Sequence, residues 1–360
     1  MKKALSLAFA FLFVFTCLTP CFAADVSKIE DYKALFVAGE GPEVDGLSVD
    51  YVSYSPETEE GVKYPLVVYF HGMNQGSKPG AQIEENNFPL WASEELQSRF
   101  TNGGAFLFVP RSHEENKEYW DDKYIVSVKA AIDDFIEANK EYVDVTRIYV
   151  GGFSMGGKMT LKMATSYPEY FAAAFPMCPA YYPSEEQYKA IANMPVWLIT
   201  SKYDVVAGYH VTGEDVWEGI CNNTTVPESC RLTLFGKVCY PDGEKTPSNH
   251  YVWYAVSNDL FTYDNDKYYN AETTDANGET IILNSPNGVI SWLCSFTSEY
   301  DGETTTFTDL AKDNEDDIKD LGLGIVGSIP LVFADTVVAA FKSLLVALNK
   351  IKIYLPSFNA

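Results

Sequence analysis

Histidine is scarce in this chain of 360 residues, and cysteines do not stand at metal-binding spacings. The four histidines, His71, His113, His210 and His250, are scattered along the chain, and no two cysteines form a C-x-x-C pattern. Zinc sites usually gather such ligands at short, regular intervals. The sequence therefore predicts no metal site.

Cysteines are also too few for a disulfide framework. Two of the seven stand within the first 23 residues. Cys221, Cys230 and Cys239 share one loop-rich stretch, where an oxidising compartment would allow one disulfide among them. Cys178 ends an apolar run and is expected to be a buried thiol.

Basic residues are outnumbered by acidic ones. There are 26 lysines and arginines against 50 aspartates and glutamates, which gives a net charge of −24. A chain this acidic repels phosphates, so no nucleic-acid partner is expected. Negative charge also keeps secreted proteins soluble, so it identifies no substrate by itself.

No apolar run is long enough for a comfortable membrane span. Met1, Lys2 and Lys3 give a basic start, residues 4–15 are uncharged and mostly apolar, and Ala23 is a small residue at a candidate cleavage point. This is the pattern of a secretory signal peptide, residues 1–23, and it predicts a secreted, extracellular protein.

Residues 298–360 differ from the chain before them. An acidic, threonine-rich linker leads into an apolar tail, whose uncharged stretch at residues 321–334 is short for a span. Two interpretations stay open: the tail docks on the protein's own apolar surface, or it attaches the protein to a membrane or cell surface.

Between residues 24 and 297, short apolar runs alternate with segments of helical spacing. This alternation predicts an α/β protein with a mostly parallel, doubly wound sheet and helices on both faces. Residues 47–54 predict an antiparallel strand at the sheet edge, and Asn277-Gly278 predicts a small hairpin. The candidate buried strands are residues 66–70, 105–109, 147–153, 171–178 and 196–200, with a helix over 125–139.

One of these strands ends in Gly152-Phe153-Ser154-Met155-Gly156, which has the G-x-S-x-G spacing of a nucleophile elbow. Such a serine stands on a sharp turn from strand to helix, where flanking glycines permit close backbone approach. The helix that follows directs its N-terminal N–H groups at negative charge forming beside the hydroxyl. Ser154 is therefore the candidate nucleophile.

A serine hydroxyl needs a base to take its proton and a third group to orient that base. In α/β hydrolases the chain order is serine, acid, histidine. Asp204 directly follows the apolar strand at 196–200, and His250 lies in a later loop. The order predicts a triad of Ser154, Asp204 and His250, with His113 and His210 outside it.

The oxyanion that forms during such catalysis needs N–H donors. One is expected from Met155, the residue after the nucleophile, and the other from Met73, in the loop that follows the strand at 66–70. His71 is expected to brace that loop. Among aromatic residues in or near loops, Trp253 is the best candidate for the substrate pocket, because it follows His250 by three positions.

The ordered set resembles the secreted polyhydroxybutyrate-depolymerase and feruloyl-esterase branch of the α/β-hydrolase superfamily, over roughly residues 45–297. The matching segments are residues 65–72, 109–112, 152–157, Asp204, His250 with Trp253, and 288–293. The resemblance implies ester hydrolysis through an acyl-enzyme, with Ser154 as nucleophile, His250 as base and Asp204 orienting it. Asn249 stands where the branch commonly has glycine, and Ser201-Lys202 replaces its usual His-Gly.

These observations predict a secreted serine esterase that acts on small-molecule or polysaccharide-linked esters and needs no cofactor, because the triad and oxyanion donors supply the chemistry. The expected organisation is a signal peptide at 1–23, a catalytic domain at 24–297 and the tail at 298–360. Two alternatives stay open. One is a peptidase of the prolyl-oligopeptidase type, and the other is a binding or adhesion protein that keeps the fold without turnover.

Overall fold

The computed structural model describes residues 24–84, 86–114, 119–240, 243–258, 269–283, 288–301 and 305–310, without the side chains of 210–212. The predicted signal peptide, residues 311–360 of the expected linker and apolar tail, and the side chain of His210 lie outside the described residues. Within them, no helix is long and apolar enough to cross a membrane.

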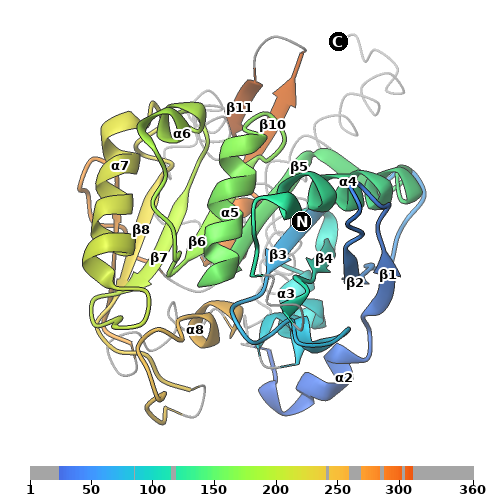
Figure 1. Cartoon of the computed structure of the whole chain (residues 1–360), viewed down its shortest axis with the longest axis horizontal. Coiled ribbons are helices and arrows are strands. Elements are labelled where there is room, and N and C mark those ends of the chain that lie inside the picture. The colour runs from blue at the N-terminus through green and yellow to red at the C-terminus, as the bar shows by residue number, and fades with distance from the viewer. Residues whose placement is uncertain are drawn as a thin grey trace, which may run out of the picture.

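A large sheet forms the centre of the molecule (Figure 1). In the described part of the chain it has nine strands in the order β1-β2-β4-β3-β5-β6-β7-β8-β9. Neighbours from β4 to β8 are parallel, whereas β1, β2 and β9 run antiparallel to their neighbours. The strands are β1 (Val37–Glu40), β2 (Asp50–Tyr54), β3 (Tyr64–Phe70), β4 (Phe106–Pro110), β5 (Val143–Phe153), β6 (Ala173–Met177), β7 (Trp197–Ser201), β8 (Arg231–Phe235) and β9 (Ala271–Asp275).

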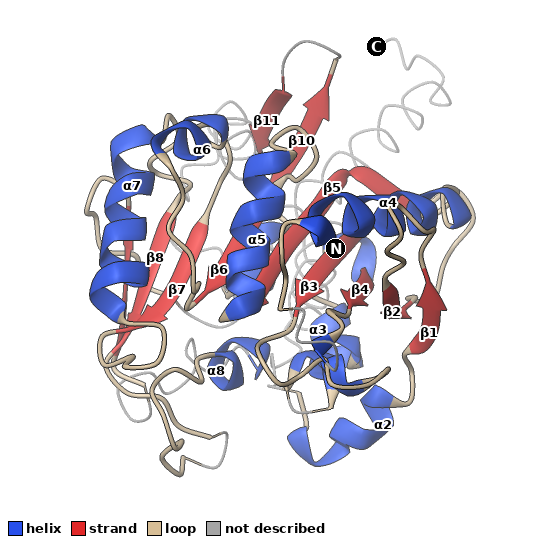
Figure 2. Cartoon of the chain, viewed as in Figure 1, coloured by secondary structure: helices blue, strands red, loops and turns tan. Residues whose placement is uncertain are grey.

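Helices lie in front of the sheet and behind it, and Figure 2 shows α5 crossing its front. The α-helices are α2 (Ile29–Lys33), α3 (Glu94–Gln97), α4 (Lys123–Ala138), α5 (Met155–Ser166), α6 (Glu185–Ala190), α7 (Asp215–Asn223), α8 (Trp253–Asn258) and α10 (Val289–Leu293). The 3-10 helices are η1 (Val26–Lys28), η2 (Ala81–Ile83), η3 (Phe88–Ala92) and η4 (Thr101–Gly103), and η6 (Tyr209–Glu214) is a π-helix.

Strand β3 shows why the sheet is covered on both faces. All seven of its residues are buried, and side chains that alternate along a strand point to opposite faces. Val67 and Tyr69 join the apolar core that includes η3, α8 and α10, whereas Val68 and Phe70 join the core formed with α4 and α5. The continuous apolar run thus predicted a strand with helices on each side, and this prediction is confirmed.

The strand at residues 47–54 needs a correction. It is antiparallel as predicted, but β2 is not at the sheet edge, because β1 pairs with it and forms the edge instead. The run at 37–40 has only four residues and is mostly exposed, so it carries little apolar pattern. At the opposite edge, the predicted hairpin at Asn277-Gly278 extends from β9, with Thr274 bridged to Thr280.

A separate hairpin, β10 (Phe296–Tyr300) with β11 (Thr305–Asp309), crosses the expected domain boundary at residue 297. The Tyr149 hydroxyl donates to the Phe296 carbonyl at 3.0 Å, and Ser229 donates to Asp309 at 3.2 Å. The described chain therefore stays attached to the sheet as far as Asp309. In Figure 1 this hairpin points away from the edge near α8.

Candidate active site

Ser154 occupies a strained turn between β5 and α5. Its φ of 56° and ψ of −114° lie where residues other than glycine are rare. The turn requires small neighbours: a Cβ built on Gly156 would lie 2.0 Å from the Phe70 carbonyl oxygen, and one on Gly152 would lie 2.6 Å from it. The Ser154 N–H donates to the Met177 carbonyl at 2.8 Å, which fixes the turn against β6.

The Ser154 hydroxyl faces His250, although 96 positions separate them. Ser154 Oγ lies 2.9 Å from His250 Nε2, and His250 Nδ1 lies 2.7 Å from Asp204 Oδ2. All three residues are buried. The structure thus brings together the three residues that the chain order selected, in a continuous hydrogen-bonded line.

The Asp204 carboxylate is held for this contact from both sides. Burial by itself would raise its pKa, but the hydrogen bond and charge of His250, together with the Val206 and Ala207 N–H groups, outweigh burial and lower the pKa. Val206 and Ala207 donate to Asp204 Oδ1 at 2.8 and 3.1 Å. One oxygen therefore anchors the loop after β7, while the other meets the imidazole.

His250 is positioned by its own loop and by the turn residue beside the serine. Its N–H donates to Ser248 Oγ at 3.1 Å. The Phe153 ring lies with its centroid 4.7 Å from the imidazole centroid. These contacts hold an imidazole that no regular element carries.

The two expected oxyanion donors lie at different elements. Met155 is the first residue of α5, and Met73 lies in the loop after β3, with its side chain half-exposed. Within the described part of the chain, neither the Met73 N–H nor the Met155 N–H donates a hydrogen bond to another group. Both N–H groups are therefore available to a ligand.

Trp253, the expected pocket residue, begins α8 and is buried. Its ring centroid lies 4.2 Å from that of Phe153 and 4.9 Å from that of Tyr254. Its indole Nε1 has no hydrogen-bond partner among the described residues. Two other tryptophans, Trp91 and Trp120, are buried in the two apolar cores.

The remaining histidines within the described chain have other partners. His71 is fully buried, with Nδ1 2.7 Å from the Gly72 carbonyl and Nε2 accepting the Ser112 N–H at 3.1 Å. Burial lowers the pKa of His71 to about 4, so its imidazole is neutral. His113 lies 3.0 Å from Asp50. None of these hydrogen bonds joins His71 or His113 to the Ser154 hydroxyl.

A buried thiol adjoins the triad. Cys178 follows β6 with a φ of 42°, and its Sγ, an Asp204 oxygen and a His250 nitrogen lie within 4.8 Å of one another. Such a set has the chemistry of a metal site, but the His250–Asp204 hydrogen bond already engages two of its three ligands. Burial, and then the Asp204 charge, raise the pKa of this thiol. Across the described residues, no disulfide joins any two of the five cysteines.

Residues 49–228, which are half of the chain, match the Esterase family. The strand order of the sheet and the turn at Ser154 agree with this match. The chain belongs to the Esterase family. Its membership places the serine turn, Met73 and Asp204 within the matched residues and leaves His250 beyond them.

Three solved structures are similar to this Esterase-family protein. A thermostable esterase superposes with a TM-score of 0.50 at 20% identity, covering 61% of this chain and 60% of its own. Pyrococcus horikoshii acylaminoacyl peptidase gives 0.47 at 16%, covering 65% and 43%. Est1E from Butyrivibrio proteoclasticus gives 0.44 at 15%, covering 64% and 98%. The chain thus spans 60% and 43% of the first two proteins, and no curated protein matches its sequence.

The thermostable esterase and the family together establish an α/β-hydrolase fold. The predicted α/β-hydrolase superfamily is therefore confirmed. The sequence did not indicate that Cys178 would lie beside Asp204 and His250. This contact joins residues distant in the chain and leaves no motif.

Proposed function

We propose that this protein is a serine esterase that hydrolyses carboxylic esters through Ser154, His250 and Asp204. The observation that supports it is the continuous line from Ser154 Oγ to His250 Nε2 at 2.9 Å and from His250 Nδ1 to Asp204 at 2.7 Å. A hydroxyl with a base in reach, and a base with a carboxylate to orient it, is the arrangement that nucleophilic acyl transfer needs.

Acylation begins when Ser154 Oγ attacks the ester carbonyl carbon and its proton passes to His250 Nε2. The negative charge that develops on the carbonyl oxygen is stabilised by the N–H groups of Met73 and Met155. The carbon–oxygen bond to the alcohol then breaks, and the departing alcohol takes the proton from His250. Asp204 keeps the imidazole in the tautomer that presents Nε2 to the serine.

Deacylation repeats these steps with water. Water attacks the acyl-enzyme carbonyl while His250 accepts its proton, and the proton returns to Ser154 as the carboxylic acid leaves. The protein's own groups thus supply the nucleophile, the base and the electrostatic stabilisation, so we propose no cofactor.

The substrate class follows from the resemblance to the polyhydroxybutyrate-depolymerase and feruloyl-esterase branch. We assign acyl groups carried on polysaccharide as the substrate and Trp253 as part of the pocket near His250. The cluster of Phe153, Trp253, Tyr251 and Tyr254 supplies aromatic surface directly beside the base. Aromatic surface binds phenolic acyl groups and sugar rings.

The same proposal includes export. The basic and apolar pattern of residues 1–23 directs secretion, residues 24–297 form the catalytic domain, and residues 298–360 dock on the domain or attach it to a surface. A secreting host should release a protein whose first residue is Ala24, as intact-mass measurement would establish.

Hydrolysis of acetyl, butyryl and feruloyl esters, beside a matched p-nitroanilide, tests the catalytic proposal. The variants Ser154→Ala and His250→Ala should each lower kcat about 10⁴-fold or more, because triad residues act as a unit. Ser291→Ala is the matched control, since Ser291 is buried in α10 and its hydroxyl donates to the Gly288 carbonyl rather than to a triad residue.

Two results would overturn the proposal. A folded, unmutated protein that hydrolyses no ester and whose Ser154 resists an active-site phosphonate would favour the binding-protein alternative. Cleavage of the anilide as fast as the matched ester would instead favour a peptidase.

A further inference from the structure

The loop after β3, residues 71–76, has its backbone held by side chains on each side of Met73. The Gly72 N–H donates to Gln75 Oε1 at 2.8 Å, and the Gly72 carbonyl lies 2.7 Å from His71 Nδ1. Beyond Met73, the Asn74 N–H and the Gly76 N–H both donate to one carboxylate, that of Glu114. The Met73 N–H is thus the amide between two fixed segments.

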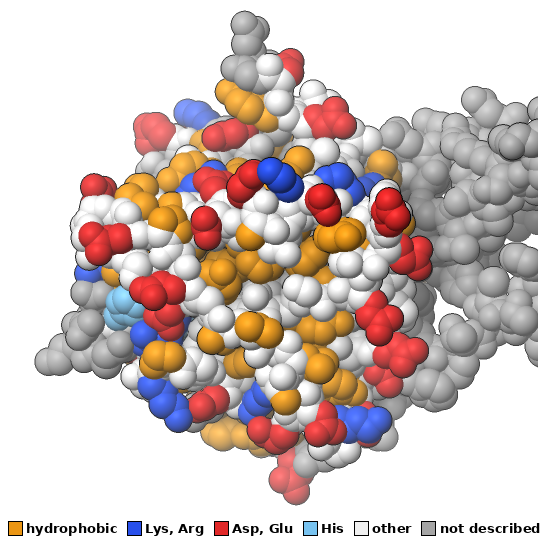
Figure 3. Space-filling view, turned by 90° about the vertical axis from the view of Figure 1, so that its right-hand side faces the viewer, with side chains coloured by type: hydrophobic (Ala, Val, Ile, Leu, Met, Phe, Trp, Pro, Cys, Tyr) orange, Lys and Arg blue, Asp and Glu red, His pale blue; other side chains and the backbone are white. Residues whose placement is uncertain are grey.

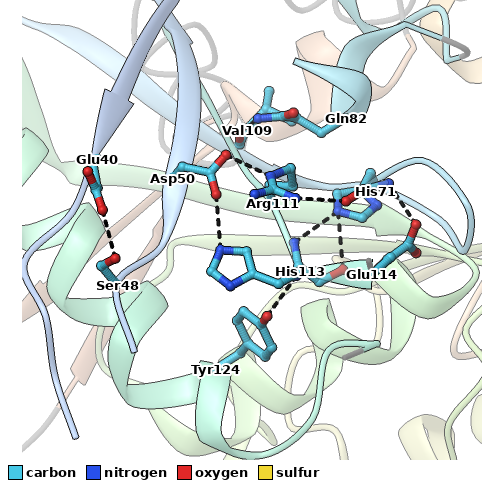
Figure 4. Close-up of polar contacts among 12 residues, drawn as sticks. Glu40, Ser48, Asp50, His71, Gln82, Val109, Arg111, His113, Glu114 and Tyr124 are labelled. Atoms are coloured by element: carbon cyan, nitrogen blue, oxygen red, sulfur yellow. Dashed lines mark hydrogen bonds and ion pairs between the residues drawn. The ribbon is translucent and has the colours of Figure 1, made fainter. Parts of the chain in front are cut away.

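Glu114 uses both of its oxygens on this loop. Oε1 accepts the Asn74 N–H at 2.9 Å and Oε2 accepts the Gly76 N–H at 2.8 Å. The residue is 9% exposed, so these contacts are sheltered from water. Hydrogen bonds to an ionised, sheltered oxygen are roughly twice as strong as neutral ones. Figure 4 shows Glu114 beside His71 and Arg111, on the segment that follows β4.

The two hydrogen bonds to Glu114 hold the backbone of the loop in an uncommon conformation. Asn74 has a φ of 67°, in the left-handed region that is uncommon for residues other than glycine, although asparagine adopts it more readily than most. Arg111 adds a second hold, because its guanidinium donates to the Gly76 carbonyl at 3.0 Å and to Asp50 at 2.7 Å. Without a carboxylate to accept both N–H groups, the left-handed conformation at Asn74 loses two hydrogen bonds that hold the backbone around it.

We propose that Glu114 is a positioning residue that aims the Met73 N–H at the developing oxyanion. This role rests on the proposed esterase function and goes beyond it, since Glu114 is proposed to act through the Asn74 and Gly76 N–H groups rather than by contact with the reacting atoms. An oxyanion donor must be fixed before the reaction, because its contribution depends on distance and angle in the transition state.

The role requires a carboxylate in particular. An amide at position 114 offers one accepting oxygen and one donating NH₂, so it satisfies one loop N–H and opposes the other. A negative charge near the oxyanion also disfavours its formation by repulsion. The benefit of Glu114 must therefore come from geometry rather than from its field.

The test compares Glu114→Gln with the unmutated full chain on an ester and on the matching thionoester, whose C=S group accepts hydrogen bonds weakly. We expect Glu114→Gln to lower kcat for the ester about 10-fold to 100-fold with KM little changed, and the preference for ester over thionoester to narrow by a similar factor. Loss of one oxyanion donor outright costs 10²-fold to 10³-fold.

Asp275→Asn is the matched control. Asp275 is likewise buried and accepts two loop N–H groups, those of Asn277 and Glu279, at 2.9 and 2.8 Å, but it lies on edge strand β9. Its substitution should leave kcat and the ester preference unchanged. Amide hydrogen exchange in Glu114→Gln should rise in a peptide covering residues 72–76.

Equal loss of activity toward both esters, or no loss, would overturn the role of Glu114 while leaving the esterase in place. Absence of any hydrolysis by the unmutated protein would overturn the esterase and this role together. If Glu114→Gln does not fold, Glu114→Asp keeps the charge on a shorter side chain. Its kcat and its preference for ester over thionoester should lie between those of Glu114→Gln and the unmutated protein. If its ester preference equals that of the unmutated protein, the proposal is overturned.

Discussion

His71 is a buried neutral imidazole whose protonation the fold resists. Its Nε2 accepts the Ser112 N–H, and burial lowers its pKa to about 4. The unfolded chain takes up this proton near the ordinary value of about 6.5, so the native state binds fewer protons between these limits. The stabilisation is therefore complete above about pH 6.5 and is lost as the pH falls toward 4.

His71 alone should therefore make the free energy of unfolding depend on pH in this range. The unmutated protein should lose about 2 kcal/mol of unfolding free energy from this site between about pH 7 and pH 5. His71→Gln keeps an acceptor for Ser112 but cannot titrate, so its unfolding free energy should fall less over the same interval. Urea unfolding at the two pH values measures both slopes, and equal slopes would contradict the assignment.

Asp204 shows a pH dependence of the same sign, but at lower pH. Its lowered pKa means that the contacts of the carboxylate with His250 and with the loop after β7 stabilise the fold above the unfolded value, and are lost only as the pH falls through the lower folded value. The Asp204 carboxylate therefore stays ionised in mild acid, at pH values where the buried His71 already lowers the free energy of unfolding.

At the scale of elements, the loops after β3, β5, β7 and β8 converge on one edge of the sheet. Parallel strands place their carboxyl ends together, so residues far apart in the chain meet there. In Figure 1 this edge lies near α8, the helix that directly follows the histidine loop. The site is thus a product of strand direction, with α5 packed close to β3 behind the serine.

That close packing makes a sharp prediction at Gly156. Alanine is the better helix former by about 1 kcal/mol, but its Cβ would lie 2.0 Å from the Phe70 carbonyl oxygen in β3. The clash should dominate, since overpacking costs about 1–3 kcal/mol and this contact is with backbone. We expect Gly156→Ala to lower the unfolding free energy by about 2 kcal/mol and to reduce esterase activity by displacing Ser154.

Urea unfolding and ester hydrolysis measure these two effects. Gly103→Ala is the control, because no atom lies within 4 Å of its added Cβ and only its φ of 78° opposes alanine. That variant should lose about 1 kcal/mol with unchanged kcat. A Gly156→Ala protein as stable as the unmutated one would show that α5 can move away from β3.

At the scale of the whole molecule, negative charge is spread over the surface. Figure 3 shows acidic side chains distributed around one face, with apolar atoms and a few lysines and arginines between them. With a net charge of −24, the folded state concentrates a repulsion that the expanded unfolded chain relieves. Salt screens such repulsion, with a Debye length of about 30 Å at 0.01 M and about 8 Å at 0.15 M.

We therefore expect the urea midpoint of unfolding to rise when NaCl is raised from about 10 to about 150 mM. A triple variant, Glu57→Lys, Glu59→Lys and Glu60→Lys, reverses three exposed charges in the loop before β3. Its midpoint should respond less to salt. A midpoint that falls with salt in the unmutated protein would indicate that attractive ion pairs, rather than net repulsion, govern its stability.

Sequence alone determined the fold class, because apolar runs of strand length alternate with helical spacing, and burial on both faces leaves that pattern in the residues. It also selected Ser154, Asp204 and His250, since chain order along a parallel sheet restricts which loops can meet. It did not place β1 at the edge, where a short exposed strand carries no burial pattern.

Only the tertiary structure determined which residues surround and hold the loops of the site. Glu114 reaches Asn74 and Gly76 across 40 and 38 positions, and Cys178 adjoins Asp204 and His250 from a different strand. Both sets of contacts join irregular loops, whose backbone path follows no period that a sequence can display. Hydrogen bonds from a side chain to a distant backbone depend on where the loops finally lie, and that is fixed only when the sheet has assembled.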